Sequence, residues 1–283
     1  MQQTTNYFKN KPKELNLSDD YNSKRIDKEW LYKQESLTDI NEMAEENQNT
    51  KTNKEFDLDQ VDLIIDLKNE ATSLYKRKQY IEALGRLEEA IKILPGDLEL
   101  LFFEAQCLYQ LGDINRAENI LSQIYKLEDS HGIKHLPKML GLCLLRLEKF
   151  KEAEKFLRDT INNVKNDIQL KGMLGYALER QNLLDEAKEV FESILKEEPD
   201  NPNACNSLAY IYYKLNRSLD KAIALVKKAL SREPENPAYL DTMGMLLMKK
   251  GNTAQARKTL KKAIKIDPKN TEIMAHLGEL LKI

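Results

Sequence analysis

Small and large apolar side chains recur from residue 64 onward with a period of 34 residues, apart from two extra residues before the third frame and one in the fifth. In a frame that starts at Ile64, positions 8 and 20 are small and position 24 is large and apolar. Two antiparallel helices approach closely only where their side chains are small, so the pattern predicts helix hairpins, with helices at positions 1–14 and 17–29. Side chains at position 24 should fill the gaps between one hairpin and the next. The small residues are Ala71, Ala105, Gly141, Gly175, Ala209, Gly244 and Gly278 at position 8, and Ala83, Ala117, Ala153, Ala187, Ala222 and Ala256 at position 20.

The ends of the frames carry residues that stop one helix and start the next. Proline stands at position 32 in four frames, and it ends a helix because it has no backbone N–H to donate. Asp97, Asn201 and Asn270 stand at position 34, where a side-chain oxygen can cap the helix that follows. We therefore expect an all-α fold of about six hairpins. The expected repeats are 64–97, 98–131, 134–167, 168–201, 202–236 and 237–270, followed by a capping helix over 271–283.

The first part of the chain has a different composition. Residues 1–56 contain no glycine, one proline and a long run of polar side chains. Such a segment buries too little apolar surface to offset its loss of conformational entropy, so we expect a disordered tail over 1–56 and the repeat domain over 57–283. Apolar residues close to helical spacing predict one short amphipathic helix at 26–46 within the tail.

Charge and cysteine content exclude several classes of protein. The 283 residues carry 44 basic and 46 acidic side chains, a net charge of -2, which disfavours nucleic acid as a partner. Three cysteines without a Cys-x-x-Cys pair disfavour a disulfide framework or a thiolate zinc site. The N-terminus lacks the order of a signal peptide and no stretch reaches 18 apolar residues, so we expect a cytoplasmic chain without a membrane span. Its abundance of Lys, Asn, Ile and Glu suggests a bacterial source.

The sequence contains no recognisable catalytic motif. A phosphate loop, a dinucleotide-binding glycine fingerprint, G-x-S-x-G and H-E-x-x-H are all absent. His131 and His135 are four residues apart and could share a helix face, but they straddle Gly132 and no third ligand stands nearby. We expect no enzyme, no cofactor, no metal ion and no small-molecule substrate.

The 34-residue pattern resembles the tetratricopeptide-repeat family over residues 64–283. The fit is close from Gly175 to Pro199 and through NSLAYIYYKLNRSLDKAIALVKKALSREPENPAYLDTMGMLLMKKGNTAQARKTLKKAIKIDP, whereas frames two and three lack the proline. The resemblance implies an α-solenoid that winds into a right-handed superhelix, with a concave wall made by the first helix of each repeat. It also implies a non-enzymatic scaffold that binds an extended or helical segment of a partner protein in this groove and helps to assemble or localise a complex.

The resemblance places ligand-facing side chains near positions 2, 5, 9, 12 and 13 of each repeat. Aromatic residues at positions 5, 9 and 12 suit a peptide, because they combine apolar area with a polar tip. Position 13 is basic in five frames of six, which favours an acidic ligand, although the helix dipole favours a cation there with or without a ligand. Asn206 is a candidate for bonding a peptide backbone. The candidate groove residues are Lys68, Tyr75, Lys76, Phe102, Tyr109, Arg146, Tyr176, Arg180, Asn206, Tyr210, Tyr213, Lys214, Met245 and Lys249.

Three other interpretations stay open. The last half repeat has an apolar stripe that could cap the array or join a second copy, which would make the chain a homo-oligomer built through this helix or the tail. Stacked aromatic residues with Arg146 or Arg180 could hold RNA bases, a weaker alternative. Residues 35–60 carry eight acidic and two basic side chains, so the tail could also lie along the basic edge of the groove and compete with an outside ligand.

Overall fold

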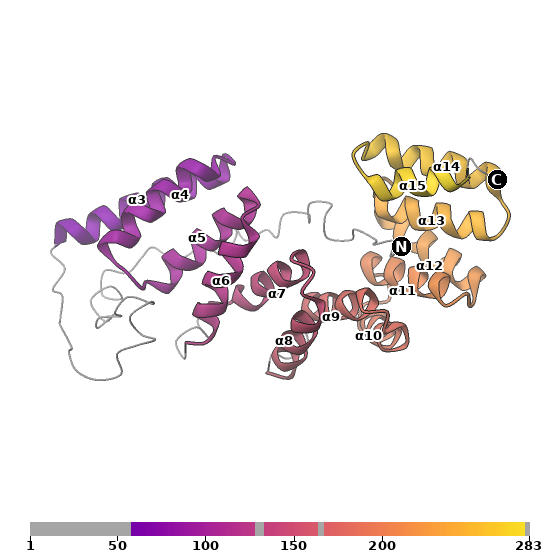
Figure 1. Cartoon of the computed structure of the whole chain (residues 1–283), viewed down its shortest axis with the longest axis horizontal. Coiled ribbons are helices and arrows are strands. Elements are labelled where there is room, and N and C mark those ends of the chain that lie inside the picture. Colours follow the sequence, from indigo (N-terminus) through magenta and orange to yellow (C-terminus); the bar gives the residue numbers. More distant parts are fainter. Residues whose placement is uncertain (1–57, 128–132, 164–166, 281–283) are drawn as a thin grey trace. The chain divides into compact units, whose positions relative to one another are not determined.

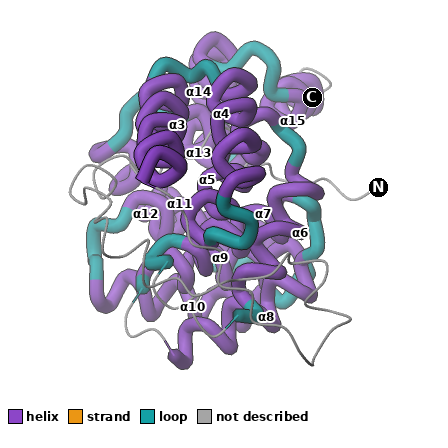
Figure 2. The backbone as a smooth tube through the Cα atoms, turned by 90° about the vertical axis from the view of Figure 1, so that its left-hand side faces the viewer, coloured by secondary structure: helices purple, strands orange, loops and turns teal. Residues whose placement is uncertain are grey.

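A computed structural model describes residues 58–127, 133–163 and 167–280 and confirms the all-α prediction for them: they form thirteen helices and no strand (Figures 1 and 2). The expected helix at 26–46 lies outside the described residues. The helices are α3 (Leu58–Lys76), α4 (Tyr80–Ile93), α5 (Leu98–Leu111), α6 (Ile114–Tyr125), α7 (Leu136–Arg146), α8 (Phe150–Asn163), α9 (Ile168–Arg180), α10 (Leu184–Glu197), α11 (Pro202–Lys214), α12 (Leu219–Arg232), α13 (Pro237–Lys249), α14 (Thr253–Ile266) and α15 (Thr271–Leu280).

The helices divide into two compact units, an N-terminal unit with α3–α7 and a C-terminal unit with α8–α15. Within each unit, helices that follow one another in sequence pack together and bury the small and apolar positions of the repeat between them. In the N-terminal unit, Ala71, Ala83 and Leu87 belong to one buried cluster. In the C-terminal unit, Ala209, Ala222 and Val226 form the corresponding cluster of the α11–α12 hairpin.

The residues expected to start and stop helices do so. The carboxylate of Asp97 accepts a hydrogen bond from the backbone N–H of Leu100 at 2.8 Å, and it caps α5. Asn201 caps α11 through the N–H of Ala204 at 2.9 Å, and Asn270 accepts from the N–H of Ile273 at 3.2 Å at the start of α15. Each proline at position 32 follows the end of a second helix by two residues, at Pro95, Pro199, Pro234 and Pro268.

The large side chain at position 24 packs differently from the prediction at two hairpins. A Cβ added to Gly175 would lie 2.6 Å from Cζ of Phe191, and one added to Gly244 would lie 2.6 Å from Cδ2 of Leu260. Phe191 and Leu260 therefore cover the position-8 glycine of their own hairpin instead of filling only the gap to the next one. The glycines are needed because α9 and α13 carry a ring or a branched side chain directly against their backbone.

Each hairpin turns through a residue with positive φ at position 15. The values of φ are 63° at Lys78, 90° at Gly112, 59° at Glu148, 64° at Asn182, 53° at Asn216 and 80° at Gly251. Glycine adopts this left-handed conformation without a steric penalty, and asparagine tolerates it better than other residues do. The turns therefore share this conformation although its residue differs, and the longer turn of the fifth frame has a second positive φ, 51° at Ser218.

The last helix covers the last hairpin. Ile273 and Leu280 of α15 are each 1% exposed and belong to the same buried cluster as Leu260 and Ala263 of α14. Met274, which points away from this cluster, is 44% exposed. Most of the apolar stripe of α15 is thus used within its own chain, in contact with the helices that precede it.

Candidate protein-binding surface

The first helices of the C-terminal unit form a continuous layer, which we call the inner wall: α9, α11, α13 and α15. α9 contacts α11, α11 contacts α13, and α13 contacts α15, whereas the second helices α10, α12 and α14 have no comparable contacts with one another. In a stack of hairpins the layer whose members lie closer together is on the inside of the curve. This wall is where a partner segment can touch several repeats at once.

The fourteen candidate groove residues fall into two sets, one in each unit. Lys68, Tyr75, Lys76, Phe102, Tyr109 and Arg146 belong to the N-terminal unit, and the other eight belong to α9, α11 and α13 of the inner wall. Their exposure is uneven: Phe102, Tyr109, Asn206, Tyr210 and Met245 are buried, whereas Lys76, Arg146, Lys214 and Lys249 are exposed.

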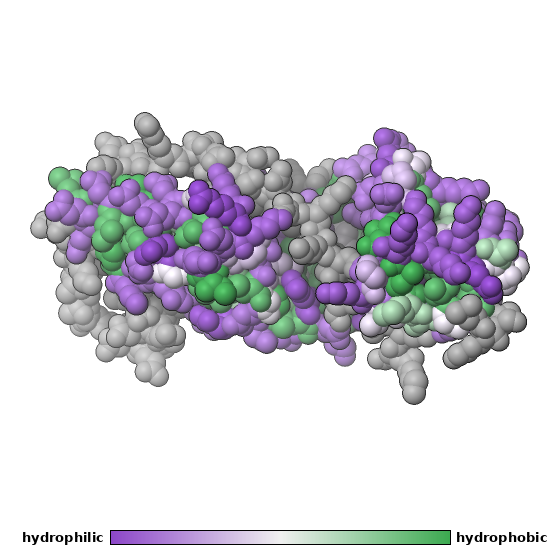
Figure 3. All heavy atoms as spheres, turned by 90° about the horizontal axis from the view of Figure 1, so that it is seen from above, coloured by the Kyte–Doolittle hydropathy of each residue, from purple (hydrophilic) through white to green (hydrophobic). Residues whose placement is uncertain are grey.

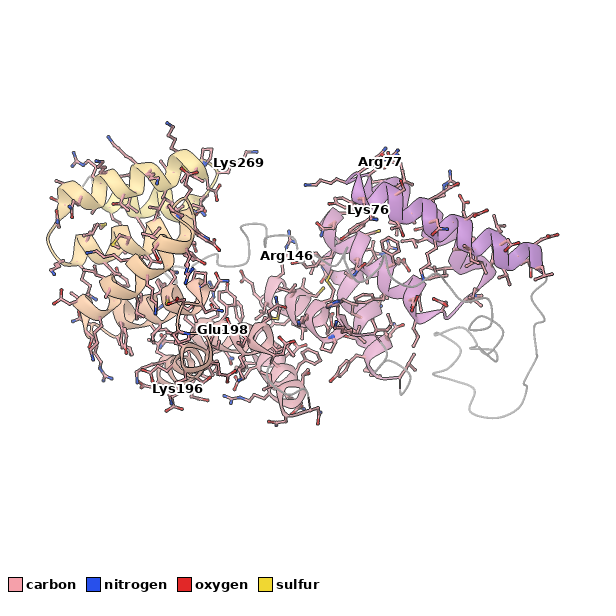
Figure 4. All side chains as sticks on the ribbon, turned by 180° about the vertical axis from the view of Figure 1, so that it is seen from behind. Lys76, Arg77, Arg146, Lys196, Glu198 and Lys269 are labelled. Carbon is pink, nitrogen blue, oxygen red and sulfur yellow. The ribbon has the colours of Figure 1, made fainter. Side chains whose placement is uncertain are left out.

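Four of the five basic residues at position 13 lie over aromatic rings. The guanidinium of Arg146, at the end of α7 (Figure 4), is 5.0 Å from the ring centre of Tyr109. Lys249 Nζ is 4.6 Å from the ring centre of Tyr213 and also donates to the backbone oxygen of Tyr213 at 2.8 Å. Arg180 lies over Phe150 and Tyr176, and Lys214 over Tyr210. A cation over an aromatic face is attracted to it, so Arg146, Arg180 and Lys249 help to hold one helix against another, whereas Lys214 and Tyr210 lie on the same helix.

An unsatisfied amide lies at the centre of the inner wall. Asn206 is 0% exposed, and neither its Oδ1 nor its Nδ2 has a hydrogen-bond partner among the described residues. The same position of the preceding first helix is Gly172, where an added Cβ would meet no described atom within 4 Å. Position 5 of the repeat thus carries a buried, unsatisfied amide on α11 and no side chain on α9. Buried polar groups are normally hydrogen-bonded, so this one needs an explanation.

Asp241 occupies the equivalent position of the next first helix, α13, and its carboxylate has a hydrogen-bond partner. Its Oδ1 and Oδ2 are 2.9 and 3.0 Å from Nδ1 of His276 on α15, and both residues are buried. Burial alone would lower the pKa of His276, but the hydrogen bond and charge of Asp241, with the charges of Glu279 and Glu272, outweigh it and raise the pKa above 6.5. The position that holds an unpaired amide in α11 thus holds, in α13, an aspartate whose carboxylate contacts His276 and links α13 to α15.

The inner wall holds another buried carboxylate, Glu179, whose pKa is raised. Burial raises the pKa of Glu179 from 4.5 to about 7, against the opposing charges of Lys214 and Arg180 and with a smaller contribution from Glu272. Glu179 is 8% exposed and precedes Arg180 at the end of α9. Nearby on α11, the rings of Tyr210 and Tyr213 are stacked with their centres 6.2 Å apart. The wall therefore offers aromatic faces, carboxylates and cations close to the unsatisfied amide.

The N-terminal unit has a similar but separate set of polar and aromatic contacts. Lys68 Nζ is 2.6 Å from Oε2 of Glu99, so the predicted groove lysine is paired within the unit. Tyr75 meets the ring of Phe103 edge-on at 5.5 Å. Gln106 on α5 is 2% exposed, and its Nε2 has no hydrogen-bond partner in the described part of the chain.

The described residues support no metal or thiol chemistry. Within residues 58–127, 133–163 and 167–280, no three His, Cys, Asp or Glu side chains come together in a way that could hold a metal ion. His131 lies outside these ranges, and His135 precedes α7. Burial raises the pKa of Cys107 and of Cys143 to about 12, so both stay protonated thiols within a core, as their apolar neighbours predict. No helix in the described ranges has the length and apolar character needed to span a bilayer.

Residues missed by the sequence reasoning are those whose role depends on a neighbour one repeat away. Glu179 and His276 were not among the candidates, and the pairing of Asp241 with His276 has no local sequence signal. A histidine 35 residues after an aspartate at the equivalent wall position was the one available hint.

Comparison with known proteins agrees with the geometry. Family models match three stretches of the chain: anaphase-promoting complex, cyclosome, subunit 3 over residues 76–160, and two tetratricopeptide-repeat models over 178–246 and 237–270. A TPR repeat-containing protein of Pseudomonas aeruginosa is 25% identical over 195 residues. That alignment covers 68% of this chain and 33% of the relative, so the chain spans about a third of the length of this curated protein.

Solved structures with the same architecture include three that align with most of the chain. The crystal structure of the hetero-tetramer Cut9–Hcn1 of the anaphase-promoting complex has a TM-score of 0.64 at 17% identity, covering 79% of this chain and 45% of that one. A tetratricopeptide-repeat protein from Parabacteroides merdae gives 0.64 at 16% identity, covering 77% and 84%. PilW, a type IV pilus biogenesis factor, gives 0.61 at 18% identity, covering 76% and 98%. With the 34-residue pattern and the stacked hairpins, the repeat models show that residues 178–270 are tetratricopeptide repeats, and the solved structures show that the chain shares the fold of tetratricopeptide-repeat proteins.

Proposed function

We propose that this chain is a protein-interaction scaffold and that the inner wall of its C-terminal unit binds an extended segment of a partner protein, helping to assemble or localise a complex. The tetratricopeptide fold in general serves protein–protein interaction, and its members are generally non-enzymatic. The observation that carries the proposal for this wall is the amide of Asn206, which is buried with its donor and acceptor both unsatisfied.

The amide suits the backbone of a bound segment. A side-chain amide offers a donor and an acceptor side by side, and a peptide group presents an acceptor and a donor in return. Leaving such a group buried without partners costs about 1–3 kcal/mol. A ligand segment that displaces the side chains covering Asn206 and supplies both hydrogen bonds removes this penalty.

The surroundings of Asn206 favour an extended segment over a small molecule. Gly172, at the same repeat position of the preceding first helix, has open space where a side chain would stand, so another backbone can approach α9 there. Tyr210, one turn further along α11, presents an aromatic face, and Lys214 and Lys249 lie at the exposed edge. An edge of this kind favours a ligand with acidic side chains next to its bound backbone. A chain that runs across α9, α11 and α13 would meet all of these groups in turn.

A steric block tests the assignment directly. Peptides selected from a random library by the full-length chain would be labelled, and their dissociation constants would be measured by fluorescence anisotropy for the wild type and for Gly172→Leu. Because no described atom lies within 4 Å of the added Cβ, the leucine should be accepted by the free chain and should obstruct the ligand. We expect the dissociation constant to rise at least about tenfold, equivalent to about 1.4 kcal/mol.

Gly85→Leu is the matched control. Gly85 lies in α4, a second helix of the N-terminal unit, and an added Cβ there also meets no described atom within 4 Å. The control should bind the selected peptides as the wild type does. Equal affinity of all three chains, with helicity intact by circular dichroism, would show that the peptides bind elsewhere.

A further inference from the structure

The N-terminal unit holds a buried amide whose nitrogen has no hydrogen-bond partner. Gln106 on α5 is 2% exposed, and its Nε2 bonds to no described residue. Hydrophilic side chains dominate the described surface that Figure 3 shows, where water can satisfy them. A buried amide lacks this access to water, so an unpaired one needs an explanation. Because Nε2 is a donor, the missing partner is an acceptor.

Aromatic rings stand on either side of Gln106 along α5. Phe102 precedes it by four residues and Tyr109 follows it by three, so the three side chains share one face of the helix, which we call the α5 face. Both rings are buried, at 2% and 5% exposed. Next to this face, Gln110 Nε2 donates to the hydroxyl of Tyr75 on α3 at 3.3 Å, which links α5 to the preceding first helix.

Arg146 of α7 places a guanidinium over the α5 face (Figure 4). It is exposed, and it lies 5.0 Å from the ring centre of Tyr109. Burial raises the pKa of Tyr109, and Arg146 opposes this rise. A guanidinium carries five N–H donors in a plane, so stacking on a ring leaves donors at its edge for an acceptor. Because Tyr109 lies one turn from Gln106, Arg146 and the unpaired Nε2 serve neighbouring parts of one face.

The carboxylates of α5 are paired with other cations. Glu99 Oε2 is 2.6 Å from Lys68 Nζ, and Glu104 Oε1 is 3.6 Å from Arg116 Nη2. These are the two acidic residues of α5, and α7 contains no acidic residue. No ion pair joins Arg146 to a carboxylate of the described residues. The guanidinium therefore lies beside an unpaired donor without an anion of its own.

Arg146 differs in this respect from the cations at the equivalent position of the C-terminal unit. There the buried carboxylate of Glu179 opposes the charges of Lys214 and Arg180. Lys249 Nζ donates to a backbone oxygen of α11 at 2.8 Å. The α5 face instead combines a cation and an unsatisfied donor, and both call for an acceptor.

We propose that the α5 face with Arg146 is a second binding site, which takes an aspartate or glutamate side chain of a partner segment. The carboxylate pairs with the guanidinium of Arg146 and, by displacing the side chains that cover Gln106, accepts a hydrogen bond from Nε2. A carboxylate fits better than a neutral acceptor, because its bonds to a guanidinium are charge-assisted and often bidentate. The site uses no residue of the C-terminal unit, so it does not depend on the function proposed for the inner wall.

The two units then differ in the chemistry that they recognise. On the inner wall, Asn206 lacks partners for both a donor and an acceptor, which suits a peptide backbone. At the α5 face, the unpaired groups are the donors of Gln106 and Arg146, which suit an acidic side chain. A chain with both sites can hold two segments of one partner, and linked binding events of this kind strengthen each other without new contacts.

Peptide selection with the full-length chain tests the second site. Random peptides with acetylated N-termini and amidated C-termini carry carboxylates on their side chains alone. Panning should retain a class rich in Asp and Glu, whose dissociation constants, measured by fluorescence anisotropy, are the same for the wild type and for Gly172→Leu. Exchanging the bound Glu of such a peptide for Gln should raise its dissociation constant at least about tenfold. Raising the salt concentration from about 0.05 M to about 0.5 M should raise it several-fold, because exposed charges are then screened.

Arg146→Met is the decisive variant, because it removes the charge and keeps a long side chain over the ring of Tyr109. It should reduce the preference of the site for the Glu peptide over the Gln peptide to less than about threefold. Lys92→Met, at an exposed site of α4, is the control and should keep the full preference. Circular dichroism should show the same helicity for both variants.

Three results would overturn the proposal. One is a selection that yields no acidic class of peptides. Another is a preference for Glu over Gln that survives Arg146→Met or that Lys92→Met removes equally. The third is a single-stranded oligouridine that binds more tightly than the acidic peptides and is lost in Arg146→Met, because the site would then serve RNA.

Discussion

Replacing Asn206 by leucine should make the unliganded chain more stable and its binding weaker. Leucine has nearly the same branched shape as asparagine but no polar group to leave unsatisfied. Asn206 is 0% exposed and both ends of its amide lack a described partner, so the substitution removes a buried-polar penalty of about 1–3 kcal/mol. Most core substitutions destabilise a protein, so a gain in stability here would be diagnostic.

The loss of binding follows from the same amide. Two hydrogen bonds to a ligand backbone, each worth about 1 kcal/mol net, predict a dissociation constant about 30 times higher for Asn206→Leu. Urea denaturation followed by circular dichroism would measure stability, and anisotropy with a selected peptide would measure affinity. Asn163→Leu, at an exposed site of α8, is the control and should change neither quantity by more than about 0.5 kcal/mol. A less stable Asn206→Leu chain, or one that binds the peptide as the wild type does, would refute the reasoning.

Three further predictions concern packing and pH. Gly175→Ala should lower the urea midpoint, because the new Cβ would lie 2.6 Å from the ring of Phe191. Gly172→Ala in the same helix should raise the midpoint by an amount equivalent to about 0.5–1 kcal/mol, because alanine favours a helix more than glycine does. The reverse order of the two midpoints would contradict the packing described. Because the pKa of Glu179 is raised from 4.5 to about 7 in the folded chain, the contribution of Glu179 to stability falls as pH rises through that range. Glu179→Gln should therefore flatten the dependence of unfolding free energy on pH and stabilise the chain by about 1–3 kcal/mol at pH 8. An unchanged pH dependence in urea titrations would count against this prediction. The pKa of His276 is also raised in the folded chain, so the stabilisation by protonated His276 is complete below pH 6.5 and is lost as pH rises through its folded pKa. Hydrogen exchange of α15, corrected for intrinsic rates, should accelerate over this pH range in the wild type and not in His276→Gln.

The sequence predicted those features of the fold that depend on residue type at a fixed frame position. Small residues mark close helix approach, prolines mark helix ends, and Asp97 or Asn201 marks a helix start, because each acts through local geometry that other parts of the chain do not change. The positive φ at position 15 could also have been predicted, since Gly112, Asn182 and Gly251 are residue types that tolerate it. Lys78 and Glu148, which stand at the same frame position, hid this pattern because neither residue type favours positive φ.

The candidate surface was only partly predictable. Frame position identified Asn206 as facing the wall, but its lack of a partner depends on the side chains packed around it, just as the pairing of Asp241 with His276 depends on another helix. Likewise, the position-13 cations were visible in the sequence, but their contacts with aromatic rings of other helices were not, because these depend on packing between elements. Pairings across 30 or more residues carry no periodic signal.

Hydrogen–deuterium exchange of the full-length chain with and without a selected peptide would test the central claim most directly. The account predicts that the peptide slows exchange in the first helices of the C-terminal unit, at Ile168–Arg180, Pro202–Lys214 and Pro237–Lys249, with the largest change around Asn206. Protection confined to α10, α12 and α14, or to the N-terminal unit, would contradict it.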